Sequence, residues 1–197
     1  MKPLERYRPM RLWTEISRLI QQLRQQGLRL TFMAAVDKFG RKLLGRPIWR
    51  YSWITPNILL GGQPARRLQR QLHAIGVTGV INMREEYDYA DHVSTLAHQF
   101  KYLYLPTADN TAPLLEHLQQ GVAFMQEVLR DKGKLYIHCW EGLGRGPTMV
   151  AAYLVSTGLM PDEAWDYICK VRPFIRPVPE QKARLEEFAK VIQQPAL

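Results

Sequence analysis

Hydrophobic positions recur at helical spacing through the first quarter of the chain. One stripe consists of Leu12, Trp13, Ile16, Leu19, Ile20 and Leu23, and a second of Phe32, Met33, Val36, Phe39, Leu43 and Leu44. Lysine and arginine residues fall on the other faces, so each stripe predicts an amphipathic helix. We expect Gly27 to interrupt the first helix, and Gly45 with Pro47 to end the second.

From about residue 51, short apolar runs alternate with helical periodicities. The apolar runs predict strands at 57–60, 79–82, 102–105 and 134–138. The periodicities predict helices at 64–75, 113–130, 145–157, 161–171 and 179–193. Pro161 and Pro179 suit the first turn of a helix, and Gly158 suits the end of one. Strands that alternate with helices predict an α/β fold with helices on both faces of a sheet.

Net charge divides the chain at the same point. The first 50 residues contain 12 Lys or Arg against three acids and carry the whole excess of +9, whereas residues 51–197 contain 15 of each sign. We therefore predict a basic amphipathic helical extension over 1–50 and one α/β domain over 51–197. The extension could dock on an anionic membrane surface, cap the domain, or act as an organelle transit peptide. Nucleic-acid binding is not expected, because the sequence lacks a recognised module for it.

Composition indicates the cellular compartment in which we expect the protein. Hydrophobic residues make up 46% and charged residues 23%, as in folded globular proteins. No apolar run approaches the roughly 18 residues that span a bilayer, and the start of the chain lacks a secretory apolar region. With only Cys139 and Cys169, a disulfide framework is implausible. We expect a reducing compartment, the cytoplasm or an organelle interior, with peripheral membrane contact left open and secretion excluded.

The stretch HCWEGLGR, residues 138–145, carries the strongest chemical signal. It lies between a predicted strand and a predicted helix, at the edge where α/β sheets bind ligands. Gly142 and Gly144 permit unusual backbone conformations, so the amides of the loop could turn inward as an anion-binding nest. The helix N-terminus and the fork of Arg145 would add positive field. That field favours a thiolate at Cys139, aimed at a bound phosphate.

These residues resemble the HCxxGxxR signature of the cysteine-based protein tyrosine phosphatases, specifically the small dual-specificity branch. The resemblance covers about residues 51–195 and implies a central mixed, mostly parallel sheet of about five strands flanked by helices. It implies that Cys139 is the nucleophile, that Arg145 clamps the phosphoryl group, and that His138 steadies the loop. The phosphate cradle is then formed by Trp140, Glu141, Gly142, Leu143, Gly144 and Arg145.

A general acid is needed to protonate the leaving oxygen. Asp109 lies at the end of a predicted strand and 30 residues before Cys139, and family members carry their acid in a similarly placed loop. Asp109 would donate a proton in the first step and activate water in the second. Its alternative role is to begin the helix predicted at 113. Asp88 and Asp91 are weaker candidates, because they lie in a polar loop.

Within the branch, four pieces are most similar to the mitochondrial-type phosphatidylglycerophosphate phosphatases: ILLGGQP, GVINMREEYD, LPTADNTAP and TMVAAYL. The resemblance implies a membrane lipid monophosphate as the favoured substrate, and it places Arg84, Glu85, Glu86 and Tyr87 near the pocket entrance. Glu141 would repel further phosphates. A protein phosphatase acting on phosphotyrosine remains the alternative, because Trp140 suits an aromatic phosphate. A glucan phosphatase ranks below both.

One residue departs from the family pattern. Most relatives have Ser or Thr directly after the arginine, where the hydroxyl eases departure of the thiolate from phosphocysteine, whereas this chain has Gly146. Thr148 could substitute from two residues further on. The departure keeps open a phosphate-binding pseudophosphatase that turns over slowly or not at all.

The remaining candidates are weaker. His73, His92, His98 and His117 lack metal-ligand spacing, so we expect neither a metal nor a cofactor. Cys169 lies in a helical run and is expected in the core. Gln181 could position water but suits a structural role better, and Arg176 could border the pocket or lie on the surface.

Overall fold

The computed structural model describes residues 28, 32–33, 35–36, 39–40, 43, 49, 51–64, 66–88 and 100–193. Within them the elements follow the order β1 (Tyr51–Thr55), β2 (Ile58–Gly61), α2 (Arg66–Ala74), β3 (Val77–Arg84), β4 (Lys101–Thr107), α4 (Leu115–Arg130), β5 (Lys134–His138), α5 (Arg145–Ser156), α6 (Pro161–Val171) and α7 (Pro179–Gln193). The predicted helix over 12–23, together with Asp91, His92 and His98, lies outside the described residues.

The strands form one mixed sheet in the order β1-β2-β5-β3-β4. β1 is antiparallel to β2, while the pairs β2–β5, β5–β3 and β3–β4 are parallel. The predicted α/β fold with a mostly parallel sheet is therefore confirmed. β2 and β5 are buried along nearly their whole length, as parallel strands covered on both faces must be.

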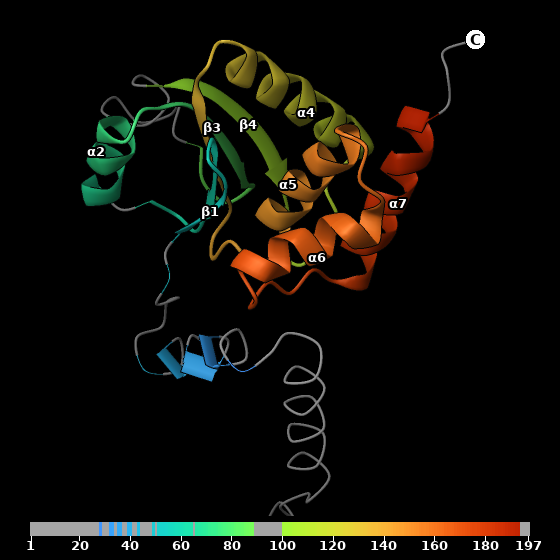
Figure 1. The fold of residues 1–197 in the computed structure, drawn as a ribbon, viewed down its shortest axis with the longest axis horizontal. Helices are drawn as coiled ribbons and strands as arrows, with labels where there is room; N and C mark the ends of the chain where they lie inside the picture. The colour runs from blue at the N-terminus through green and yellow to red at the C-terminus, as the bar shows by residue number, and fades with distance from the viewer. Residues whose placement is uncertain are drawn as a thin grey trace, which may run out of the picture.

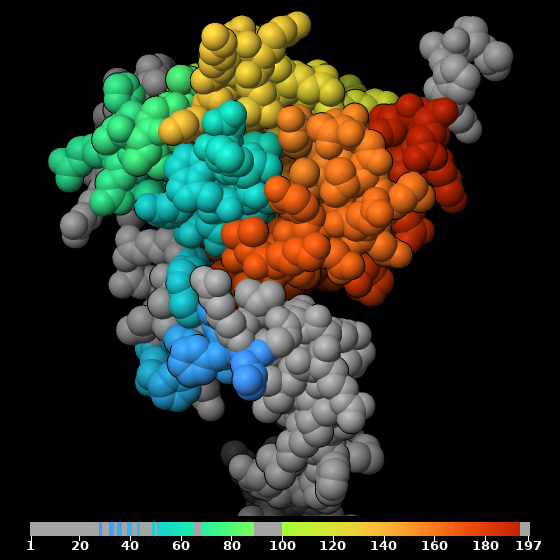
Figure 2. Space-filling model, viewed as in Figure 1, coloured from blue at the N-terminus to red at the C-terminus, as the bar shows by residue number. Residues whose placement is uncertain are grey.

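Helices cover both faces of this sheet (Figure 1). α2 packs on one face, where Leu68 and Leu72 meet Leu59, Val80 and Tyr136. The other face carries α4, α5, α6 and α7, whose apolar side chains build the larger core. On this side α6 also lies against β1, and the two segments are adjacent at the surface (Figure 2).

α5 is the central helix of the larger layer. Nearly every residue from Arg145 to Val155 is buried, and the helix packs against α4, α6 and α7. A Cβ at Gly121 of α4 would collide with the sulfur of Met149, so glycine permits the close approach of α4 and α5. Because α5 is held on several sides, its N-terminus is a rigid base for the loop that precedes it.

The sequence pattern predicted four of the five strands and missed β1. Tyr51–Thr55 pairs with β2 through a tight turn at Pro56 and Asn57, and most of its side chains are half-buried or exposed, whereas the inner strands are buried almost throughout. The strand lies at the sheet edge, where half-exposed side chains weaken the apolar signal. The five predicted helices of this domain are all present, with boundaries that differ by one or two residues.

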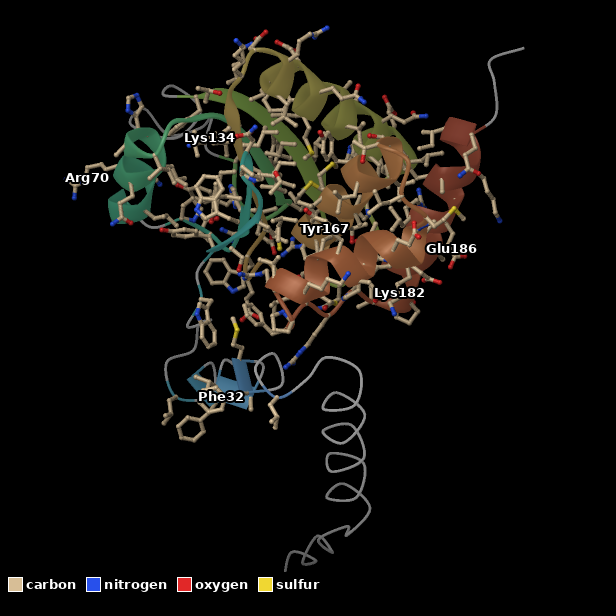
Figure 3. The ribbon with its side chains drawn as sticks, in the orientation of Figure 1. Phe32, Arg70, Lys134, Tyr167, Lys182 and Glu186 are labelled. Carbon is tan, nitrogen blue, oxygen red and sulfur yellow. The ribbon has the colours of Figure 1, made fainter. Side chains whose placement is uncertain are left out.

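Every described residue of the basic extension between 28 and 43 is helical. Leu28, Phe32, Phe39 and Leu43 are all exposed. Figure 3 shows the side chain of Phe32 pointing away from the sheet. No helix in the described part of the chain combines the length and the apolar character needed to cross a membrane.

Candidate active site

Cys139 follows β5 directly, at the carboxyl edge of the sheet. Gly61 of β2 and Asn82 of β3 both pair with His138, so the ends of three parallel strands meet beside the cysteine. The chain then turns through residues 139–144 and enters α5 at Arg145. Cys139 is only 3% exposed and is a free thiol, as is Cys169. The nucleophile candidate thus lies at the floor of a loop fixed between a buried strand and a buried helix.

The carbonyl groups of residues 140–144 all accept hydrogen bonds from the surrounding protein. The donors are Gln63 N–H to Trp140 (2.8 Å), Arg172 to Glu141 (3.1 Å) and Gly142 (2.9 Å), Arg176 N–H to Leu143 (2.6 Å), and Thr148 N–H to Gly144 (3.0 Å). In a trans peptide the C=O and the next N–H point in opposite directions. The N–H groups of residues 141–145 therefore face the interior of the loop, as an anion-binding nest requires.

One of these inward N–H groups contacts the sulfur. The amide of Gly142 donates to Sγ of Cys139 at 3.2 Å. A peptide donor of this kind stabilises negative charge on sulfur, and it lies where oxygens of a bound phosphate would also find donors.

Glycine is required at 142 and 144 for different reasons. Gly142 has a φ of +71°, and a Cβ there would also collide with the carbonyl of Gly61. Gly144 has a φ of −125°, outside the left-handed region, so it does not use the backbone freedom expected from the sequence. A Cβ at 144 would instead lie 2.8 Å from Oε1 of Gln181. The second glycine therefore makes room for a buried amide.

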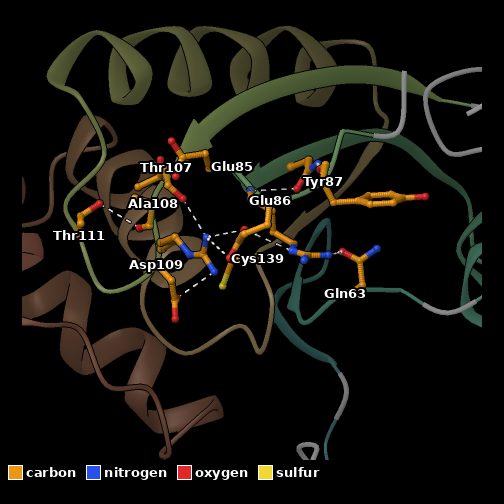
Figure 4. A network of polar contacts seen from close by, with 12 residues as sticks. Gln63, Glu85, Glu86, Tyr87, Thr107, Ala108, Asp109, Thr111 and Cys139 are labelled. Atoms are coloured by element: carbon orange, nitrogen blue, oxygen red, sulfur yellow. Dashed lines mark hydrogen bonds and ion pairs between the residues drawn. The ribbon is translucent and has the colours of Figure 1, made fainter. Parts of the chain in front are cut away.

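Arg145 lies beneath the loop, 2% exposed, and is held by three partners. Its Nη1 donates to both carboxylate oxygens of Glu86, at 3.0 and 3.2 Å, and to the carbonyl of Thr107 at 2.8 Å. Its Nη2 lies 2.9 Å from Oδ1 of Asp109. Figure 4 draws these contacts, with Glu86, Asp109 and Cys139 gathered around the guanidinium.

The charges of this cluster support one another. Burial alone would lower the pKa of Arg145, but the hydrogen bond to Glu86 and the negative groups at Cys139, Glu86 and Asp109 raise it above its ordinary value. Burial alone would raise the pKa of Glu86, but the hydrogen bonds and the charges of Arg145 and Arg84 hold it below its ordinary value. Both groups therefore stay ionised, and Glu86 fixes one side of the guanidinium.

Asp109 lies in a tight turn immediately after β4. Asn110, at φ +58°, supplies the left-handed residue of the turn, and its side-chain amide donates to Asp109 at 3.1 Å. The backbone and the hydroxyl of Thr111 both donate to the carbonyl of Ala108. The side chain of Asp109 is 61% exposed, so it reaches Arg145 while remaining at the pocket mouth.

A cavity of about 350 Å³ opens above the sulfur. It is lined by Asp109, Asn110, Cys139, Trp140, Glu141, Leu143, Gly144, Arg145, Arg176, Val178 and Gln181. Trp140 is 54% exposed, and the guanidinium of Arg84 lies 4.4 Å from the centre of its ring. The cavity thus has hydrogen-bond donors for an anionic ligand at its base and aromatic and aliphatic side chains at its rim.

His138 is fully buried, and burial lowers its pKa to about 3 despite the contact of its Nδ1 with the carbonyl of Cys139. It is therefore a neutral residue that stacks on Tyr136, with ring centres 5.6 Å apart. The hydroxyl of Thr148 donates to the carbonyl of Gly144 at 2.9 Å, so its hydrogen is engaged by the backbone of the loop.

The structure brings the predicted nucleophile, arginine and acid into one pocket, and it places two other candidates elsewhere. Asp88 accepts a hydrogen bond from the hydroxyl of Tyr102 at 2.7 Å and does not line the cavity. Cys169 lies in α6, where burial raises its pKa to about 11.

Sequence reasoning placed Glu86 only near the entrance and did not single out Arg172. The link from Glu86 to Arg145 joins residues 59 apart, and the links from Arg172 reach the loop from 30 and 31 residues away. No local pattern marks either contact, because both depend on how distant segments pack.

Comparison with known proteins identifies the family of this chain. Residues 58–191 match the model of the dual specificity phosphatase catalytic domain. The human phosphatidylglycerophosphatase and protein-tyrosine phosphatase 1 is 39% identical over 150 residues, which cover 72% of this chain and 74% of that protein. The phosphatidylglycerophosphate phosphatase PTPMT2 of Arabidopsis thaliana is 30% identical over 137 residues, covering 68% of this chain and 60% of that protein.

A solved structure has the same fold. The crystal structure of PTPMT1 in complex with PI(5)P matches with a TM-score of 0.67 and 34% sequence identity, over 73% of this chain and 96% of that one. The match of the family model extends over most of the α/β domain and includes the entire loop from Cys139 to Arg145. The chain therefore belongs to the dual specificity phosphatase family and is a cysteine-dependent phosphatase.

Proposed function

We propose that this phosphatase acts on a membrane lipid monophosphate such as phosphatidylglycerophosphate. The observation that carries the chemistry is the convergence of Cys139, the inward amides of its loop, Arg145 and Asp109 in one cavity. The substrate class is supported by relatives in human and Arabidopsis thaliana whose names state phosphatidylglycerophosphate phosphatase activity.

In the proposed first step, the thiolate of Cys139 attacks phosphorus. An S–P bond forms and the bond from phosphorus to the leaving oxygen breaks, while Asp109 gives its proton to that oxygen. In the second step water attacks phosphocysteine, Asp109 takes the proton of the water, and the S–P bond breaks. Inorganic phosphate leaves, and the Cys139 thiolate is restored. The amides of residues 141–145 and the fork of Arg145 stabilise the charge on the phosphoryl oxygens.

The free enzyme holds Asp109 against the phosphate-binding arginine. Nη1 of Arg145 is engaged by Glu86 and Thr107, so Nη2, now 2.9 Å from Asp109, is the atom able to turn to substrate. A phosphate dianion competes with Asp109 for this atom. Binding of substrate would therefore release the Asp109 carboxyl group at the pocket mouth, next to the leaving oxygen.

Membrane contact through residues 1–50 belongs to the same proposal. Leu28, Phe32, Phe39 and Leu43 present exposed apolar side chains in a segment rich in Lys and Arg. Apolar residues flanked by cations suit an anionic bilayer surface, from which a lipid phosphate could enter the cavity. Such attachment would make the protein peripheral on a membrane facing the cytoplasm or an organelle interior.

A protein tyrosine phosphatase is the second candidate. The exposed ring of Trp140 at the cavity rim favours it, because an aromatic phosphate could stack there. The name of the human relative includes this activity as well.

The test compares phosphate release from vesicles containing phosphatidylglycerophosphate with release from phosphotyrosine peptides. We expect a higher kcat/KM on the vesicles. Cys139→Ser should abolish release, and Asp109→Asn should lower kcat by about 100-fold or more, the usual contribution of a general acid. A preference for the peptides would favour the second candidate. A burst of one equivalent without further release would refute turnover and indicate a phosphate-binding pseudophosphatase.

A further inference from the structure

We call residues 139–145 the phosphate-binding loop. Arg172 is fully buried at the end of α6 and contacts this loop from outside the cavity. Its Nε donates to the carbonyl of Gly142 at 2.9 Å, and its Nη2 donates to the carbonyl of Glu141 at 3.1 Å. One rigid guanidinium thus fixes two successive peptide planes at the tip of the loop.

One of these two planes carries the amide that contacts the sulfur of Cys139. Holding the carbonyl of Glu141 outward turns the N–H of Gly142 inward, and this N–H donates to Sγ of Cys139 at 3.2 Å. Holding the carbonyl of Gly142 outward turns the N–H of Leu143 inward in the same way. Arg172 therefore acts on Cys139 through the backbone, without touching it.

The other side of Arg172 is anchored to the chain that precedes the sheet. Its Nη1 donates to the carbonyl of Trp49 and to Oγ of Ser52, both at 3.2 Å. The guanidinium lies 4.5 Å from the centre of the Phe174 ring, and Trp49 stacks on the same ring at 6.0 Å between centres. Two hydrogen bonds to Trp49 and Ser52, and two to Glu141 and Gly142, thus tie the start of the domain to the phosphate-binding loop through the side chain of Arg172.

We propose that Arg172 is a positioning residue that sets the amides of the phosphate-binding loop, and that Trp49 and Ser52 hold it in place. Trp49 and Ser52, where the N-terminal extension joins the α/β domain, then contribute to the geometry of the site. This inference rests on the proposed role of the loop, but it concerns the anion-binding form of the loop and not the identity of the substrate.

Two variants of Arg172 and its anchor test this role. Arg172→Lys keeps the positive charge but loses the planar fork, so it cannot hold both carbonyls and both anchors. Ser52→Ala removes one anchor and leaves the fork. Arg184→Lys, in an arginine on α7 that pairs with Glu187, is the matched control. Thermal melting of each variant verifies that it is folded before measurement.

The readout is alkylation of Cys139 by iodoacetamide, assigned by peptide mass spectrometry, with and without inorganic phosphate as a protecting ligand. Cys169 serves as the internal control, because burial raises its pKa to about 11. In mildly acidic buffer we expect Arg172→Lys to react about tenfold more slowly than the native chain and to bind phosphate about tenfold more weakly, reflecting one lost charge-assisted hydrogen bond. In alkaline buffer, where thiols are ionised, its rate should approach that of the native chain.

Ser52→Ala should show a smaller loss in the same direction, about two- to threefold, and Arg184→Lys should show none. If folded Arg172→Lys and Ser52→Ala both retained native alkylation in mildly acidic buffer and native protection by phosphate, the proposal would be wrong. Neither readout requires turnover. Failure of the lipid assay together with the expected losses in Arg172→Lys and Ser52→Ala would overturn only the proposed substrate.

Discussion

Gly146 occupies the position after Arg145 where most members of the family have Ser or Thr. A Cβ added to Gly146 would lie 3.0 Å from Cδ1 of Leu60, a fully buried residue of β2. The next neighbours, the amide of Cys139 and the carbonyl carbon of His138, are both 3.7 Å away. A small side chain therefore fits if Leu60 shifts by a few tenths of an ångström, and a hydroxyl there would lie beside the backbone of Cys139.

Replacing Gly146 by Ser should accelerate the breakdown of phosphocysteine. The added hydroxyl can donate to the departing sulfur, and a hydrogen bond of about 1 kcal/mol corresponds to about a fivefold faster step. Gly146→Ala is the matched control, because it introduces the same crowding against Leu60 without the hydroxyl. Stopped-flow measurement of the burst and of the steady rate gives both steps. Equal steady rates for the two variants would contradict a role for the missing hydroxyl.

Among the elements, α7 supports the loop that carries Asp109. Gln181 in its first turn is buried, and its Nε2 donates to the carbonyl of Thr111 at 2.8 Å. Its Oε1 accepts from the N–H of Val178 at 3.1 Å and fills the space beside Gly144. Both ends of the amide are thus engaged by backbone groups. The loop that carries Asp109, the phosphate-binding loop and α7 therefore meet at the side chain of Gln181.

Loosening this contact should affect the acid more than the binding of phosphate. Gln181→Glu keeps the size of the side chain but replaces the donor to Thr111 with an oxygen. We expect kcat to fall by about five- to tenfold, because one buried hydrogen bond is lost and Asp109 is less well placed. The new carboxylate lines the cavity, so we expect it to raise KM for a phosphate substrate as well. Gln181→Met, similar in volume and uncharged, separates the lost donor from the added charge. A large rise in KM with unchanged kcat would show that Gln181 acts on substrate binding instead.

Across the whole molecule, charge is unevenly distributed: residues 1–50 carry a net charge of +9, whereas residues 51–197 sum to zero. Four described apolar side chains of the extension, Leu28, Phe32, Phe39 and Leu43, are exposed, whereas Met33 and Val36 are half-buried. Trp49, in contrast, is stacked on Phe174 and bound to Arg172. The functional boundary for a truncation therefore lies before Trp49, because removal of this residue would disturb the phosphate-binding loop as well as the extension.

Deletion of residues 1–47 should separate membrane docking from catalysis. We expect turnover of a soluble aryl phosphate to stay within about twofold, and turnover on anionic vesicles to fall by about tenfold or more, because each basic residue near such a surface contributes about 1 kcal/mol. Vesicles of zwitterionic lipid, with the same substrate fraction, are the control. Raised salt should reduce the advantage of the full chain on anionic vesicles.

Equal losses on the soluble and the vesicle substrates would contradict docking and favour the reading in which the extension caps the domain. Unchanged rates on both substrates would show that the extension has no part in activity, as expected of a transit peptide.

Local sequence was sufficient for the chemistry of the loop and for most of the fold. Strand, His138, Cys139, two glycines, Arg145 and helix stand in one short segment, so their spacing predicts their proximity. Asp109 could be placed because parallel strands bring their carboxyl ends to one edge. The sequence pattern did not predict β1, because this strand lies at the edge of the sheet and most of its side chains are half-buried or exposed. The predicted backbone freedom of Gly144 was also unnecessary, because its constraint comes from Gln181 on a distant helix.

The order of residues specifies which atoms are available for the reaction: a thiol, a guanidinium and a carboxyl group, each beside the end of a predicted strand or the start of a predicted helix. Tertiary structure alone decided which way the peptide groups of the loop point. Their orientation is set by donors from Gln63, Arg172 and Arg176, which are distant in sequence and become neighbours only when the sheet and helices pack. A peptide plane has no side chain to record its orientation, so its direction follows from the hydrogen bonds that folding makes available.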